Sequence, residues 1–175
     1  PLTAGYTGLN YRIFAFQPGN PGVVLAGSAD PSNIGAVFRS TDGGTTWARS
    51  SNGLNAAAVR GLAFSPNISG LVIAVGFPQG NVGGESSRGV WRSTDAGLTW
   101  NAVNDPGIKF NNKRAVVFDP NDGNKVLATS PTQTHSGTSA SGIVAYSSAS
   151  SVASSAWCAS SRMTASGRSC ARRRS

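Results

Sequence analysis

The sequence predicts an all-β protein, a partial β-propeller of about three four-stranded blades followed by a disordered C-terminal tail. Two observations carry this prediction. A short phrase occurs twice, as STDGGTTW at 40–47 and as STDAGLTW at 93–100. A longer pattern, two apolar runs around a turn, recurs at 11–28, 59–76 and 113–130. Phrases repeated about every 50 residues indicate a repeat architecture, and no stretch has the sustained apolar period and caps of a helix.

Each copy of the long pattern predicts two antiparallel strands joined by a turn. YRIFAFQPGNPGVVLAGS is the first copy, and VRGLAFSPNISGLVIAVG and KRAVVFDPNDGNKVLATS are the second and third. Apolar runs bounded by Pro, Asn and Gly are typical of strands at a hairpin. The aligned positions are Phe16, Phe64 and Phe118, followed by Pro18, Pro66 and Pro120.

The short phrase predicts a third strand, a tight turn and a fourth strand. AVFRS at 36–40 and GVWRS at 89–93 precede the two turns. An aspartate at the start of a turn accepts hydrogen bonds from backbone N–H groups just downstream, a glycine supplies positive φ, and a tryptophan buries a large aromatic surface. The residues with this structural role are Ser40, Asp42, Gly44, Thr46 and Trp47, and Ser93, Asp95, Gly97, Thr99 and Trp100.

Four strands in about 50 residues are typical of one blade of a radial array. A third short phrase should begin near Ser147, but Ala149 stands where aspartate is expected. We therefore divide the chain into blades at 1–147 and a low-complexity Ser/Ala/Arg tail at 148–175. The tail is either a genuine disordered linker or the product of a reading-frame slip. Because the repeat is already under way at Gly8, we expect the remaining blades of a parent propeller to lie outside this chain.

The repeated phrases resemble those of the Asp-box, or bacterial neuraminidase, repeat superfamily. Sialidases, xyloglucanase-type glycoside hydrolases, sortilin-type receptors and photosystem assembly factors share the turn. F-x-P, V-L-A-G and V-F-R-S-T-D-G-G-T-T-W are most similar to xyloglucanase-like and secreted repeat proteins, over roughly residues 8–146. The resemblance implies a propeller whose Asp box is a structural turn, remote from the catalytic face.

Charge and composition exclude several classes of function. The formal net charge of +8 is concentrated in a Ser/Ala/Arg tail, without the aromatic or groove-reading elements of a nucleic-acid-binding surface. No apolar run is long enough for a membrane span. Cys158 and Cys170 both lie in the tail and are interpreted as incidental thiols, with pairing across a short loop as the alternative. We expect no cofactor and no metal site, and His135, the lone histidine, is expected in a loop.

Propeller geometry places the candidate site on the face away from the turns, at the loops 28–35, 77–88 and 130–141. Arg12, Arg60 and Arg114 occupy the same position in each repeat. Converging guanidinium groups can fork onto a carboxylate, and the resemblance to sialidases implies a substrate-binding role; a repeat-encoded basic rim or strand-end ion pairs are the alternatives.

Asp30 and Glu85 lie in equivalent loops of successive blades and are the candidate catalytic pair. Glycoside hydrolysis needs two carboxyl groups, one as acid and one as base or nucleophile, whereas solvated loop carboxylates are the alternative. We expect part of a secreted or cell-surface, bacterial-type propeller that hydrolyses or binds polysaccharide, with the isolated chain inactive. A non-catalytic scaffold for protein binding or assembly is the alternative.

Overall fold

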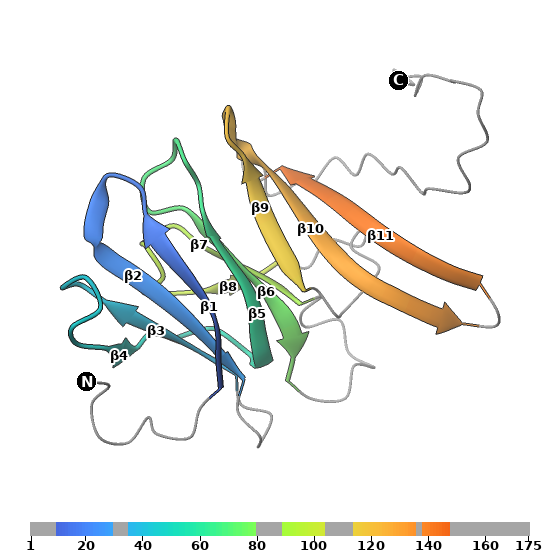
Figure 1. Ribbon diagram of the computed structural model, residues 1–175, viewed down its shortest axis with the longest axis horizontal. Coiled ribbons are helices and arrows are strands. Elements are labelled where there is room, and N and C mark those ends of the chain that lie inside the picture. Colours follow the sequence, from blue (N-terminus) through green and yellow to red (C-terminus); the bar gives the residue numbers. More distant parts are fainter. Residues whose placement is uncertain (1–9, 30–34, 80–88, 104–113, 136–137, 148–175) are drawn as a thin grey trace.

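The computed structural model describes residues 10–29, 35–79, 89–103, 114–135 and 138–147, and these residues form strands and connecting turns without a helix (Figure 1). The expected all-β fold is therefore confirmed. The strands are β1 (Asn10–Gln17), β2 (Asn20–Ala29), β3 (Ala36–Ser40), β4 (Ala48–Arg49), β5 (Ala56–Phe64), β6 (Val72–Pro78), β7 (Val90–Ser93), β8 (Asn101–Ala102), β9 (Ala115–Asp119), β10 (Asp122–His135) and β11 (Thr138–Ser147).

Three antiparallel meanders follow one another along the chain, and we call them the first blade (β1–β4), the second blade (β5–β8) and the third blade (β9–β11). In Figure 1 they fan from blue through green to orange. Between named strands, backbone pairing joins the first two blades into one eight-stranded sheet through the pair Ala29↔Ala58 of β2 and β5. The isolated bridge Asn52↔Thr99 and a backbone hydrogen bond from Gly35 N to Ala56 O also span this junction. Side chains complete it.

Those side chains form a separate apolar layer at each junction. One cluster contains Leu25 from the first blade and Phe64 and Trp100 from the second. Another contains Ile73 from the second blade and Phe118 from the third. The central strand β6 contributes alternately to both, because successive side chains of a strand point to opposite faces. Its uninterrupted apolar run is thus the consequence of burial on both faces.

The repeated turns have the geometry that their residues predict. In the first turn Asp42 Oδ1 accepts from Ser40 Oγ at 2.7 Å and from Thr46 N at 2.8 Å, while Oδ2 accepts from Thr46 Oγ1 at 2.6 Å. Ser40 Oγ in turn accepts from Gly44 N at 2.8 Å. Gly44 has φ 97°, a conformation that a residue with Cβ rarely adopts.

The second turn repeats this network almost atom for atom. Asp95 Oδ1 accepts from Ser93 Oγ at 2.7 Å and from Thr99 N at 2.9 Å, and Oδ2 accepts from Thr99 Oγ1 at 2.6 Å. Gly97 has φ 84°. Its Cα also lies so close to Leu25 of the first blade that an added Cβ would meet that side chain at 2.8 Å. This glycine serves both the turn and the packing between blades.

Both kinds of turn lie at the same end of the blades. Gly43 N donates to Gly22 O at 2.9 Å in the first blade, and Ala96 N donates to Gly70 O at 2.8 Å in the second. Each bond joins the short-phrase turn to the turn between the two inner strands. We call this the turn end, and the opposite end, where β1, β5 and β9 begin, the arginine end.

The third blade differs from the expectation in the length of its strands. A loop was expected over 130–141, but β10 continues to His135, which pairs with Thr138 of β11. The expectation that His135 lies in a loop is therefore wrong for its backbone. The ladder between β10 and β11 has a register shift between Ser130 and Gln133. Residues 148–175 are outside the described residues, so the division at 147 and both hypotheses for the tail stay predictions.

Candidate ligand-binding surface at the arginine end

The three repeated arginines lie in the innermost strands or immediately before them. Arg12 is in β1, Arg60 is in the middle of β5, and Arg114 immediately precedes β9. Neighbouring strands of a meander run in opposite directions, so the end of β5 and the end of β7 lie together at the turn end. The start of β5 is then at the opposite end, and the same holds for β1 and β9. The fold thus separates these arginines from the repeated turns by the length of a strand.

Arg60 is the central member of the set. Its guanidinium carbon lies 4.4 Å from the centroid of the Phe77 ring, a cation–π distance. Its Nε is buried and has no hydrogen-bond partner. Burial lowers the pKa of Arg60, and the positive charges of Arg12 and Arg114 lower it further. The charges of both other predicted arginines therefore act on Arg60, which also carries an unsatisfied N–H donor.

Phe77 is a part of this surface that the sequence reasoning missed. It follows Gly76 at the end of β6, where the first blade has Ala29. Because only the second copy of the repeat carries an aromatic residue there, the alignment of repeats gave no reason to select it. The sequence feature that could have identified Phe77 is its position as an aromatic residue at the same end of the blade as Arg60.

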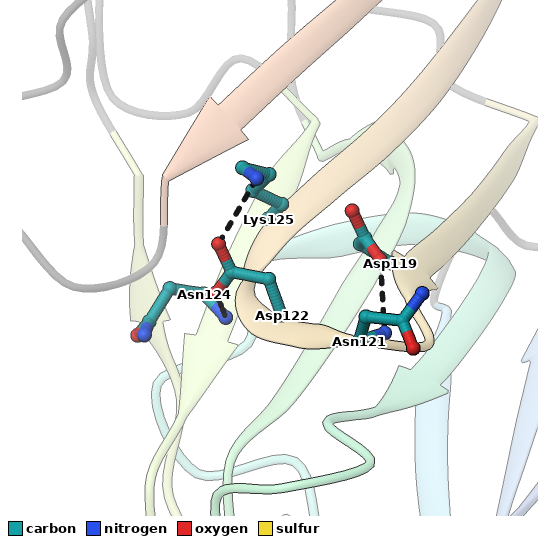
Figure 2. Close-up of polar contacts among 5 residues, drawn as sticks. All are labelled: Asp119, Asn121, Asp122, Asn124 and Lys125. Carbon is teal, nitrogen blue, oxygen red and sulfur yellow. Dashed lines mark hydrogen bonds and ion pairs between the residues drawn. The ribbon is translucent and has the colours of Figure 1, made fainter.

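The carboxylates among the described residues lie at the turn end, where they accept hydrogen bonds or form an ion pair. Asp119 Oδ1 accepts from Asn121 N at 2.9 Å, and Asp122 Oδ1 accepts from Asn124 N at 3.0 Å (Figure 2). Lys125 Nζ lies 3.2 Å from Asp122 Oδ2. The hydrogen bond from Asn124, together with Lys125, lowers the pKa of Asp122. These groups stabilise a turn.

The aspartates of the repeated turns are likewise held in their charged form. Hydrogen bonds from Thr46, and then from Ser40, lower the pKa of Asp42 to about 2. Burial opposes the charge of Asp95, but hydrogen bonds from Thr99 and Ser93 outweigh it and the pKa is lowered. A general acid must carry a proton near the working pH. Both side chains are therefore unsuited to protonate a leaving group.

Asp30 and Glu85, the candidate catalytic pair, lie outside the described residues. The described residue before the first loop, Ala29, pairs with Asn10 at the start of β1. Among described residues, no three His, Cys, Asp or Glu side chains are grouped so that they could hold a metal ion. The part of the chain that the structure describes contains no helix with the length and apolarity needed to cross a membrane.

A groove lies at the rim of the junction between the first two blades. It is lined by Trp47, Arg49 and Leu98, among others. Another lining residue, Arg39, donates from Nε to Ala96 O at 3.0 Å, so its guanidinium already joins the two blades. We therefore assign this groove to packing rather than to ligand binding.

Comparison with known proteins places the chain near xyloglucanases. It is 34% identical over 96 residues to the xyloglucanase Xgh74A of Acetivibrio thermocellus and 33% identical over 104 residues to a xyloglucanase of Hypocrea jecorina. These matches cover 51% and 55% of this chain but only 10% and 11% of the relatives. No family model matches the chain.

Among solved structures, the GH74 enzyme of Niastella koreensis superposes with a TM-score of 0.55 at 22% identity, over 83% of this chain and 22% of that enzyme. At this identity the likeness concerns the fold alone. It supports the assignment of the three meanders as blades of a β-propeller. The chain is therefore an all-β partial propeller, similar in sequence to a small part of two xyloglucanases.

Proposed function

We propose that this chain supplies blades to a secreted, polysaccharide-acting propeller of the xyloglucanase-like kind, and that its repeated turns are Asp boxes. The observation that carries the proposal is the similarity to two xyloglucanases from different organisms over about half of the chain. The network of the repeated turns supports the second part, because serine, aspartate, glycine and threonine each make the contact that the motif requires.

In this proposal the polysaccharide lies across the arginine end. Arg12, Arg60 and Arg114 offer planar N–H donors that can bind sugar hydroxyl or carboxylate oxygens. The Phe77 ring beneath the Arg60 guanidinium supports this role, because stacking holds the guanidinium in one orientation. Asp30 and Glu85 are proposed as the catalytic carboxyl groups, one as acid and one as base or nucleophile.

Binding and hydrolysis are tested separately. Xyloglucan in an affinity gel should retard the 175-residue chain, and Arg60→Gln should reduce the retardation while Arg49→Gln, an exposed arginine on β4, leaves it unchanged. No retardation by xyloglucan or by a sialylated glycan would contradict a glycan-binding role for this surface. Equal loss in both variants would remove Arg60 from it.

Hydrolysis is measured as release of reducing sugar from xyloglucan by a longer protein that contains this chain together with further blades. Asp30→Ala and Glu85→Ala should each reduce turnover without changing the melting temperature. Unchanged turnover would remove that residue from the catalytic pair. Retardation without turnover in the longer protein would favour the non-catalytic scaffold.

A further inference from the structure

Two apolar faces lie at the outside of the described fold, one on the first blade and one on the third. Their residues occupy the same repeat positions as residues that are buried between blades. The first is on the first blade, where Phe14 and Phe16 are 54% and 66% exposed. The second is on the third blade, where Val117 and Leu127 are 57% and 46% exposed. We call these the first-blade face and the third-blade face.

Equivalent residues of the inner junctions pack against one another. Phe64 and Phe118 are the equivalents of Phe16, and Leu25 and Ile73 are the equivalents of Leu127. Phe64 lies in one cluster with Leu25, and Phe118 lies in the other with Ile73. The same phenylalanine–aliphatic combination is thus used at both junctions, and each of these four side chains is at most 8% exposed.

A second pair of positions follows the same rule. Leu62, the equivalent of Phe14, lies in one cluster with Ala15, and Val116 packs on the other cluster with Ala63. Ala15 and Ala63 are the equivalents of Val117. The first-blade face is therefore built to receive a surface like the third-blade face, and the inner junctions specify how the two would pack.

We propose that the first-blade face of one copy of this chain binds the third-blade face of a second copy, so that the chain associates head to tail. The same contacts occur at both inner junctions, so they indicate how these two faces would pack together. Such an interface is heterologous, because different surfaces of the two copies meet. Two copies bring together about six blades, within the range of 4–8 that closes a propeller. The proposal concerns the 175-residue chain by itself and does not depend on the proposed glycan-related function. In a longer protein, further blades would take the place of the second copy at the same two faces.

Sedimentation velocity of the 175-residue chain between roughly 1 and 200 μM tests the association, in a range where interfaces of modest affinity are populated. The mass is expected to rise above 17.8 kDa with concentration. Phe16→Arg and Leu127→Glu should each weaken association at least about tenfold, because each places a charge in an apolar contact. Ser69→Arg, an exposed turn residue of the second blade, is the control and should associate as the unaltered chain does.

Mixing the two variants gives the decisive outcome. Phe16→Arg retains an intact third-blade face, and Leu127→Glu retains an intact first-blade face, so an equimolar mixture should recover association that neither variant has alone. A symmetric interface made from one face would be broken by only one variant and would not be recovered by mixing. That result, or a chain that stays monomeric at the highest concentration, would overturn the proposal.

Circular dichroism of each variant should match that of the unaltered monomer, because both positions are already exposed in it. A monomeric chain whose melting temperature falls sharply on Phe16→Arg would mean that other residues of the same chain cover the first-blade face. This outcome also overturns the proposal.

Discussion

Trp47 and Trp100 occupy the same place in the repeated turn but differ in what surrounds them. Trp100 is 3% exposed and its Nε1 donates to Ser50 O of the preceding blade at 2.9 Å. Trp47 is only partly buried and its Nε1 donates to Gly44 O within its own turn at 2.9 Å. The motif specified the residue and the turn in both copies. It could not specify the burial, because burial depends on the neighbouring blade rather than on the repeat.

Replacing each tryptophan by alanine should therefore have unequal effects. Trp100→Ala should lower the free energy of unfolding by about 3–5 kcal/mol, since it removes a buried aromatic side chain and leaves a cavity. Trp47→Ala should cost about 1–2 kcal/mol, since less apolar surface is lost. Urea unfolding of dilute protein measures both. Equal losses would contradict the role of Trp100 in joining blades.

The charged aspartates of the repeated turns should make the folding stability depend on pH. The folded pKa of Asp42, about 2, is lower than the unfolded value of about 3.9. A lowered folded pKa gives stability that is present above the unfolded value and is lost as the pH falls through the folded value. The melting temperature should thus fall between about pH 4 and pH 2.

Asp42→Asn should make the fall in melting temperature between about pH 4 and pH 2 less steep. The amide does not titrate, and its oxygen can still accept the hydrogen bond from Thr46 N. Melting curves at steps of pH measure the difference between the two proteins. An identical slope in the variant would show that other carboxyl groups account for the acid loss.

At the scale of elements, equivalent strands share a pattern but differ in burial. Ile73 in β6 is fully buried, whereas its equivalent Leu127 in β10 is 46% exposed. Ile73→Ala should cost about 2–5 kcal/mol, the range for large-to-small changes in a core. Leu127→Ala should cost less than about 1 kcal/mol in the monomer. Thermal unfolding at low protein concentration checks both, and a larger loss at Leu127 would contradict the assignment of the third-blade face.

The repeat pattern predicted nearly all described strands because apolar alternation and turn residues agree at each position. It missed the extension of β10 to His135, since Ser, Thr and Gln near that position resemble a loop in isolation. Pairing with β11 overrides that local preference. For the candidate site, the sequence predicted that the arginines are equivalent, but the stacking of Arg60 on Phe77 depends on two strands coming together.

At the scale of the whole molecule, charge is distributed unevenly along the blades. Described carboxylates lie at the turn end and three arginines gather at the other. Burial and the charges of Arg12 and Arg114 lower the pKa of Arg60, so the cluster repels itself. Added salt screens repulsion between charges near the surface. The melting temperature should rise with salt, by roughly 2–4 °C for each kcal/mol by which screening reduces the repulsion.

Arg60→Gln should remove most of that salt dependence, because it takes away the arginine on which both other charges act. Arg49→Gln, on the edge strand β4, should leave it intact. Differential scanning calorimetry at low and high sodium chloride gives both values. A salt dependence that survives in Arg60→Gln would locate the repulsion elsewhere in the chain.

The sparse backbone link between the first two blades has a consequence for how the molecule comes apart. One pair between named strands, Ala29↔Ala58, and one isolated bridge, Asn52↔Thr99, span the junction, whereas long ladders run within each blade. Amide protons inside a ladder are protected by the strands of their own blade, but the junction is closed mainly by apolar contacts, which urea weakens. Partial unfolding should therefore begin with separation of the first two blades at their junction, before the strands of either blade separate from one another.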